Sequence, residues 1–224
     1  VKRDDGIGPA MGGNKTRKLE YLLAEARARG ARRVSTFGGL QSNHARMTAA
    51  AARALGMEPH LFFFEPKQGS RPGNLLIDEL LGARMHYLPL GGGGGMSVEA
   101  TSRLVRLVSL LAAGPGTYFI PVGGHGRTGC LGYITAAAEL HQQADAMGIR
   151  DALVVTAAGS GGTLAGLWAG LVLVDSPVRC LGIDVGKLWR GFPGSVEQVA
   201  RELCAFLGEP LALERVQQPV VPGL

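Results

Sequence analysis

The sequence predicts an α/β fold in which helices cover a parallel sheet. Short β-prone runs alternate with helical patterns along nearly the whole chain, which is typical of βαβ units. Glycine-rich loops at residues 38–39, 123–124 and 159–162 follow three predicted strands, at the edge where parallel sheets bind ligands. With 224 residues, 46% of them hydrophobic, the chain can bury the core of one large or two small domains.

The predicted strands are short apolar runs rich in β-branched or aromatic residues and bounded by turn residues. They are expected at residues 1–3, 33–37, 60–64, 84–88, 117–121, 152–156 and 178–185, and the run 152–156 has the pattern of a buried strand. The predicted helices follow these strands. They are expected at residues 15–29, 74–81, 98–112, 131–147, 164–174 and 196–207, with an Ala-rich helix that opens at residues 40–44 and runs to 54. The glycine run 91–95 is expected to be a flexible loop.

The first helix begins at a lysine that follows a glycine pair, in the stretch Gly12-Gly13-Asn14-Lys15-Thr16-Arg17-Lys18. Asn14 suits the N-cap position, and Gly30 suits the end of the helix. The positive end of the helix dipole lowers the pKa of an amine at Lys15, which favours attack on a carbonyl and Schiff-base formation. The alternative is a solvated lysine on a basic first turn.

A second motif, Gly159-Ser160-Gly161-Gly162-Thr163, follows a predicted strand and opens a predicted helix. Consecutive backbone N–H groups and the two hydroxyls form a phosphate cradle that needs no cation. The motif is not a Walker loop, and Leu164 stands at the third glycine position of G-x-G-x-x-G. A nicotinamide oxidoreductase stays open as an alternative, because Asp184 ends a later strand where a ribose partner sits. A tight packing turn without a ligand also stays open.

A third motif, Ser42-Asn43-His44, starts a helix after two glycines. The Ser42 hydroxyl and the free N–H groups suit a carboxylate, and Asn43 suits a phenolate-type oxygen. Plain N-capping by Ser42 or Asn43 explains the same residues. A serine hydrolase with Ser160 as nucleophile is disfavoured, because no histidine follows Ser160 in the chain.

Composition excludes several classes of protein. The net charge is +5, but no Lys/Arg-rich block with interleaved aromatics occurs, so a nucleic-acid surface is not expected. No apolar run reaches membrane-spanning length, so no membrane partner is expected. The cysteines Cys130, Cys180 and Cys204 lack metal spacing, so no metal site is expected, and their odd number fits a reducing cytoplasm.

Four stretches of the chain, taken from the N-terminus onward, carry a resemblance to a known family. They are Lys2-Arg3-Asp4-Asp5, Gly12-Gly13-Asn14-Lys15-Thr16-Arg17-Lys18-Leu19-Glu20-Tyr21, Gly38-Gly39-Leu40-Gln41-Ser42-Asn43-His44 and Gly159-Ser160-Gly161-Gly162-Thr163. Together they resemble the D-cysteine desulfhydrase and 1-aminocyclopropane-1-carboxylate deaminase family. Its members are pyridoxal-phosphate enzymes of the tryptophan-synthase-β fold.

This resemblance implies a role for each motif. Lys15 is similar to the lysine that carries pyridoxal 5'-phosphate and acts as acid and base at the substrate Cα. Asn43 is similar to the partner of the cofactor's phenolic oxygen. Ser42 is similar to the residue near the substrate carboxylate and the Cα face, with His44 beside it as a further substrate contact. Residues Gly159, Ser160, Gly161, Gly162 and Thr163 are similar to the phosphate loop.

The resemblance also implies a two-domain parallel-sheet fold. The larger, discontinuous domain is expected at residues 1–34 and 122–224, and the smaller at 35–121. In the family, a C-terminal portion carries a tyrosine at the substrate, the residue that faces the pyridine nitrogen, and closing strands. This chain stops about where that portion starts, so we expect a fragment, truncated at both ends. The family usually forms dimers, so a homodimer is expected.

The expected reaction is elimination of thiol from a small amino acid, most closely D-cysteine, to give pyruvate, ammonia and sulfide. The motif Ser42-Asn43-His44 resembles the desulfhydrase branch. Two alternatives stay open, ring-opening deamination of 1-aminocyclopropane-1-carboxylate and a catalytically idle fragment that binds the cofactor or another anion.

Overall fold

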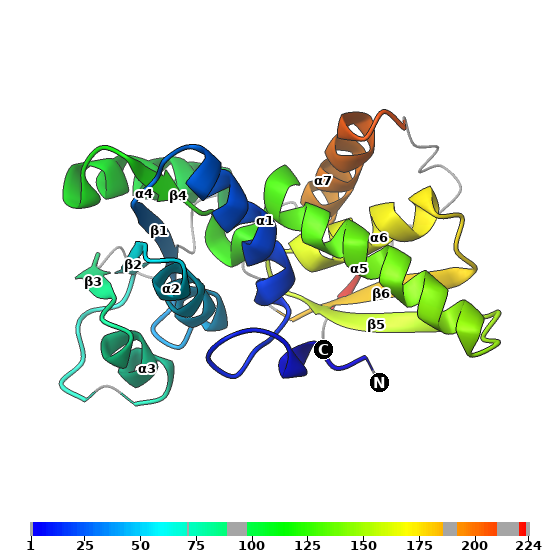
Figure 1. Ribbon diagram of the computed structural model, residues 1–224, viewed down its shortest axis with the longest axis horizontal. Helices are drawn as coiled ribbons and strands as arrows, with labels where there is room; N and C mark the ends of the chain where they lie inside the picture. The colour runs from blue at the N-terminus through cyan, green and yellow to red at the C-terminus, as the bar shows by residue number, and fades with distance from the viewer. Residues whose placement is uncertain (1, 71, 89–97, 186–191, 210–219, 223–224) are drawn as a thin grey trace. The chain divides into compact units, whose positions relative to one another are not determined.

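The computed structural model describes residues 2–70, 72–88, 98–185, 192–209 and 220–222 of the chain. The described chain divides into two compact units, Val1–Gly124 and His125–Leu224 (Figure 1). Each contains a parallel sheet, so the α/β prediction is confirmed. The predicted loop at 91–95 lies outside the described residues.

The first unit is built on a four-stranded parallel sheet with the order β3-β2-β1-β4. Its strands are β1 (Arg33–Gly38), β2 (Glu58–Phe63), β3 (Arg84–Tyr87) and β4 (Thr117–Phe119). Its helices are α1 (Lys15–Ala28), α2 (Asn43–Ala54), α3 (Asn74–Leu80) and α4 (Val98–Ala113), with short 3-10 turns η1 (Asp4–Gly6) and η3 (Val122–Gly124). These bounds agree closely with the predicted elements.

Helices cover both faces of this sheet (Figure 1). Leu61 and Phe63 of β2 pack with α2 and α3, whereas Phe62 packs on the other face against Val105 of α4. All three β2 side chains are fully buried. A strand buried on both faces is a continuous apolar run, which explains why residues 60–64 are recognisable as a strand.

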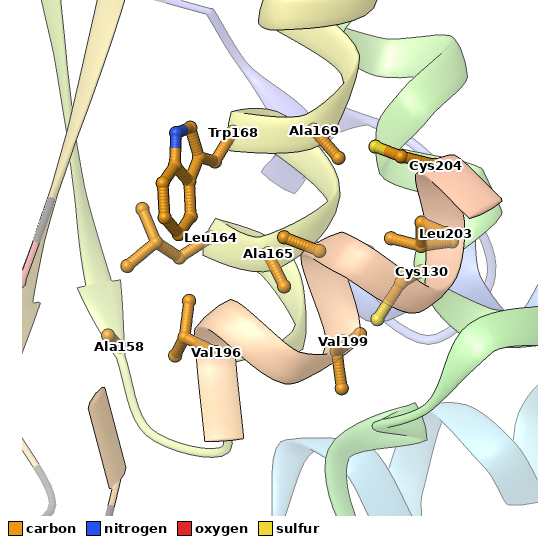
Figure 2. Close-up of a cluster of buried hydrophobic side chains, with 11 residues drawn as sticks. Cys130, Ala158, Leu164, Ala165, Trp168, Ala169, Val196, Val199, Leu203 and Cys204 are labelled. Atoms are coloured by element: carbon orange, nitrogen blue, oxygen red, sulfur yellow. The ribbon is translucent and has the colours of Figure 1, made fainter. Parts of the chain in front are cut away.

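The second unit contains a three-stranded parallel sheet with the order β5-β6-β7. The strands are β5 (Ala152–Ala158), β6 (Val178–Asp184) and β7 (Val220–Pro222), and the helices are α5 (Arg127–Ala146), α6 (Gly162–Leu173) and α7 (Phe192–Phe206). Figure 2 shows Leu164 and Trp168 of α6 in one buried cluster with Ala158 of β5 and Val196 of α7. Helix α6 is buried from Gly162 to Leu171, because α5 and α7 also pack against it.

Three predicted features differ from the structure. Lys2 and Arg3 are not in a strand but precede η1, because no strand of the described chain pairs with them. Helices α5 and α7 begin four residues earlier than predicted, at Arg127 and at Phe192. Gly129 and Gly194 lie in their first turns, and glycine favours loops, so the sequence pattern places both starts too late. Strand β5 is not buried on both faces, since Leu153 and Val155 are 49% and 59% exposed while Ala152 and Val154 pack against the helices.

The position of α1 bears on the expected domains. Its apolar face, Leu19 with Leu22, packs against Met47 of α2 and Ile120, so α1 belongs to the core of the first unit. The discontinuous assignment of residues 1–34 and 122–224 to one larger domain, with 35–121 as the smaller, stays a prediction.

Candidate functional site

The turn before Lys15 has an unusual backbone. Four consecutive residues have positive φ angles, namely 49° at Ala10, 66° at Met11, 60° at Gly12 and 132° at Gly13. A Cβ at Gly12 would lie 2.4 Å from the carbonyl oxygen of Ile7, so only glycine fits there. Non-glycine residues in this region carry strain, of the kind that proteins store at functional sites.

Side chains of the same unit hold this turn in place. Arg17 of α1 forms a partly buried ion pair with Asp4 at 3.0 Å, and the carbonyl oxygen of Asp4 accepts a hydrogen bond from the Gly13 amide at 3.0 Å. The Thr16 hydroxyl donates to the carbonyl oxygen of Ile7 at 3.2 Å. The backbone that leads into Lys15 is therefore fixed on both sides before any ligand binds.

Lys15 is the first residue of α1, as predicted, and it is half-buried. The expected cap is wrong in one respect, because Asn14 has a helical backbone and its side chain does not cap the helix. A Cβ at Gly13 would lie 3.2 Å from Sδ of Met47. The turn of residues 10–13, called the glycine turn below, therefore lies against the first turns of α2. The structure thus brings the start of α1 and the start of α2 together.

Ser42 is the N-cap of α2. Its Oγ accepts a hydrogen bond from the Ala45 amide at 3.2 Å, so the capping role left open by the sequence is confirmed. A contact of Ser42 with a substrate carboxylate stays a prediction.

Asn43, the first residue of α2, is exposed and has a defined amide orientation. Its Oδ1 accepts from Nδ2 of Asn74 at 3.0 Å and from Nη2 of Arg46 at 3.4 Å. With the oxygen occupied by two donors, the group that Asn43 can offer to a ligand is Nδ2–H, which suits an anionic oxygen.

His44 lies inside the first unit and is 4% exposed. Its Nε2 is 2.9 Å from the Thr36 hydroxyl, and that hydroxyl donates to the carbonyl oxygen of Ile120 at 2.9 Å. His44 must therefore donate through Nε2. Burial, together with the ammonium groups of Lys15 and Lys18, holds the pKa of His44 well below its usual value, so the ring is neutral at pH 7. Its role as a substrate contact stays a prediction.

Lys18 differs most from its expected environment. The sequence left open that the first turn of α1 is a solvated basic surface that includes Lys18. In the structure, Lys18 is 1% exposed, and its Nζ donates to the carbonyl oxygen of Gly123 at 3.0 Å. Nothing in the local sequence identifies this bond, because the two residues are 105 positions apart. Lys18 ties α1 to η3 and adds positive charge beside His44.

The glycine motif lies in the second unit, between the carboxyl end of β5 and α6. Gly161 is the N-cap of α6, with φ of 77°, and no side chain caps the helix. The first-turn amides of Gly162, Thr163 and Leu164 therefore point out of a 12-residue helix without a competing side-chain acceptor at the N-cap. These amides suit a phosphate, because they donate hydrogen bonds and the positive end of the helix dipole attracts negative charge. A Cβ at Gly159 would meet no atom within 4 Å, so neighbouring atoms of the chain do not require glycine at this position.

The predicted site residues therefore fall into two groups. Lys15, Ser42, Asn43 and His44 are together in the first unit, and residues 159–163 are in the second. Sequence reasoning missed three polar residues around Asn43, namely Asn74, Arg46 and Asp78. No local pattern identifies them, because Asn74 and Asp78 are about 30 positions or more from Asn43 in the chain.

A cavity of about 460 Å³ opens elsewhere in the first unit, between α1 and α2. Leu19, Leu23 and Met47 line it, and its charged lining residues are Glu20 and Arg27. It lacks the groups that carry the predicted chemistry. In the described ranges, no cluster of His, Cys, Asp and Glu could hold a metal ion. None of the helices described there is both long and apolar enough to span a bilayer.

Known proteins match this chain in both sequence and structure. A family model described as pyridoxal-phosphate dependent enzyme matches residues 1–206. A crystal structure of an ACC deaminase homologue superposes with a TM-score of 0.83 at 35% identity, over 99% of this chain and 65% of that one.

Curated relatives of this chain carry the names of two activities. The chain is 40% identical over 179 residues to the bifunctional D-cysteine desulfhydrase/1-aminocyclopropane-1-carboxylate deaminase, mitochondrial, of Arabidopsis thaliana, covering 76% of this chain and 44% of that protein. It is 38% identical over 195 residues to the D-cysteine desulfhydrase of Klebsiella pneumoniae, covering 84% of this chain and 57% of that protein. The chain spans less than two thirds of the length of these relatives.

Proposed function

The chain belongs to the pyridoxal-phosphate dependent enzyme family, and from this premise we propose that it binds pyridoxal 5'-phosphate through Lys15. We further propose that the protein releases thiol from D-cysteine. The observation that carries the proposal is the fastened glycine turn, which starts α1 at Lys15 beside the first residues of α2. These bonds fix the backbone from which the Lys15 side chain extends, close to the first turns of α2.

Each group then has a defined task. Lys15 holds the cofactor aldehyde and later takes the proton from the substrate Cα. Asn43 donates Nδ2–H to the cofactor's phenolic oxygen, and the amides at the start of α6 bind the phosphate. When bound, the cofactor would supply an electron sink at the substrate Cα. Ser42 remains at the substrate carboxylate while its Oγ caps α2.

The overall reaction is D-cysteine plus water giving pyruvate, ammonia and hydrogen sulfide. Two features support the desulfhydrase assignment, the motif Ser42-Asn43-His44 and the name of the Klebsiella pneumoniae relative. Ring-opening deamination of 1-aminocyclopropane-1-carboxylate to 2-oxobutanoate and ammonia is the second candidate. The name of the Arabidopsis thaliana relative, which includes both activities, favours keeping it.

We propose a cytoplasmic homodimer as the working form. No disulfide joins Cys130, Cys180 or Cys204 in the described residues, which fits a reducing compartment. Size-exclusion chromatography with light scattering measures the assembly directly, and a monomer at micromolar concentration would contradict the dimer.

The substrate test measures sulfide from D-cysteine and 2-oxobutanoate from the cyclopropane substrate in parallel, after loading the chain with pyridoxal phosphate. The desulfhydrase assignment predicts sulfide and little 2-oxobutanoate, and the reverse result supports the second candidate. If the cofactor binds but neither product forms, the chain is a catalytically idle cofactor-binding fragment. L-cysteine, run alongside, tests the choice of enantiomer.

A further inference from the structure

A polar network around Asn43 joins two segments that are far apart in the chain. Asn74, the first residue of α3, donates through Nδ2 to the carbonyl oxygen of Gln41 at 2.8 Å and to Oδ1 of Asn43 at 3.0 Å. Its backbone amide donates to Oε1 of Gln41 at 2.9 Å, and Nε2 of Gln41 donates to the carbonyl oxygen of Pro72 at 2.9 Å. The loop before α2 is thereby clamped to the start of α3.

This network determines which way the Asn43 amide points. Both hydrogens of Asn74 Nδ2 are directed at acceptors, so Asn74 can only donate to Asn43. Arg46 lies on the same side and has no acceptor atoms, and it adds a second donor at 3.4 Å. An Asn43 side chain flipped by 180° would place its NH₂ against two donors, so the network rejects that orientation.

A buried guanidinium lies beside the Asn43 oxygen. Arg46 is 4% exposed, and its charge acts on Asp78, which is fully buried. Within the described residues, Nε and Nη1 of Arg46 and both oxygens of Asp78 make no hydrogen bond. Nη2 of Arg46 donates to the Asn43 oxygen at 3.4 Å, so the positive charge of the guanidinium lies beside that oxygen. This charge favours the orientation in which Oδ1 of Asn43 faces Arg46 and Nδ2–H points outward.

We propose that Asn74 and Arg46 are positioning residues that hold the Asn43 amide with Nδ2 outward, ready to donate to the phenolic oxygen of the cofactor. This inference rests on the proposed function for the identity of the ligand. The orientation itself belongs to the ligand-free chain, so it is measured without the cofactor.

The first arm of the experiment reads the orientation by NMR. The chain has three asparagines, Asn14, Asn43 and Asn74, so selective ¹⁵N-asparagine labelling gives three side-chain amide pairs. In the ligand-free protein we expect the Asn74 pair to be protected from exchange and the Asn43 pair to exchange quickly with water. In Asn74→Asp, whose carboxylate accepts but does not donate, the Asn43 amide turns inward and its NH₂ becomes protected. A protected Asn43 pair in the parent protein, or no change in Asn74→Asp, overturns the inference.

The second arm reads the consequence for the ligand as the Kd of pyridoxal phosphate by absorbance titration. Asn74→Ala removes one hydrogen bond to Asn43 and should weaken binding roughly fivefold, and Asn74→Asp should weaken it more, because it turns an acceptor outward. In the Asn43→Ala background, both changes at Asn74 should have no further effect. An equal loss in both backgrounds contradicts a positioning role and indicates a structural one.

The two arms separate the two claims. If the parent chain shows no Lys15-dependent cofactor binding but Asn43 behaves as expected by NMR, the proposed function fails and the positioning stands. If the cofactor binds but the NMR result is absent, the reverse holds. Circular dichroism of each variant confirms that the fold is retained, and Gln142→Ala, at an exposed position of α5 outside the network, is the matched control.

Discussion

Replacing Asp78 by asparagine should remove a specific dependence of stability on pH. Burial raises the pKa of Asp78 from its ordinary 3.8 to about 7, even though Arg46 opposes the shift. Between these two values the folded chain keeps a proton that the unfolded chain has lost. The free energy of unfolding therefore falls as pH rises through this window and levels off above about 7.

The magnitude follows from the same two pKa values. One proton corresponds to at most about 1.36 kcal/mol per pH unit, and integration from pH 5 to pH 8 gives a loss of roughly 2–3 kcal/mol. Urea unfolding of the parent chain and of Asp78→Asn, followed by circular dichroism at several pH values, measures it. His44 and His60 titrate in both proteins, so the difference isolates Asp78.

The control is Glu20→Gln, which removes an exposed carboxylate from α1 and is measured against the parent at the same pH values. Relative to the parent, the free energy of unfolding of Asp78→Asn should rise by roughly 2–3 kcal/mol between pH 5 and pH 8. A difference that stays constant over this range would refute the assignment of Asp78 as a buried group that is protonated in acid.

Three further substitutions test packing, capping and backbone strain by urea unfolding. Gly170→Ala places a Cβ 2.5 Å from that of Ala137 on α5, so we expect the free energy of unfolding to fall by about 1–3 kcal/mol, although alanine has the better helix propensity. Its control is Gly194→Ala on α7, where a Cβ meets nothing within 4 Å and the change should be neutral or stabilising. Equal effects of the two substitutions would contradict the packing argument. Ser42→Ala should cost about 1 kcal/mol by removing the cap of α2, whereas Ser42→Asp should retain it, and no loss in the alanine variant would contradict the cap. Met11→Gly should stabilise the chain by about 0.5–1 kcal/mol, because it relieves a non-glycine residue at φ of 66°, and a destabilised variant would show that the Met11 side chain matters more than its backbone.

The sequence is most informative where local pattern and tertiary burial agree. Strand β2 is recognisable because both its faces are buried, and α1 because Leu19, Leu22 and Leu23 form one apolar stripe. The strand-loop-helix position of residues 159–163 is likewise predictable, because glycine and small polar residues separate two apolar runs. These features depend on residues close together in the chain.

Long-range pairing accounts for most of what sequence reasoning misses. The burial of Lys18 depends on a carbonyl 105 residues away, and the orientation of Asn43 depends on Asn74, 31 residues away. Asp78 looks like an ordinary charged residue of a short helix, and only the packed structure shows it to be buried. The half-exposure of β5 is hidden for the same reason, because an apolar run does not reveal which faces of its sheet the described helices cover.

The central claim, that Lys15 is the cofactor lysine, is tested most directly by reducing the pyridoxal-phosphate-loaded chain with borohydride and mapping the modified lysine by mass spectrometry. We expect one added pyridoxyl group on Lys15, and visible cofactor absorbance that disappears in Lys15→Ala but persists in Lys67→Ala, an exposed control. Modification of Lys18 instead, or absorbance that survives in Lys15→Ala, would contradict the claim.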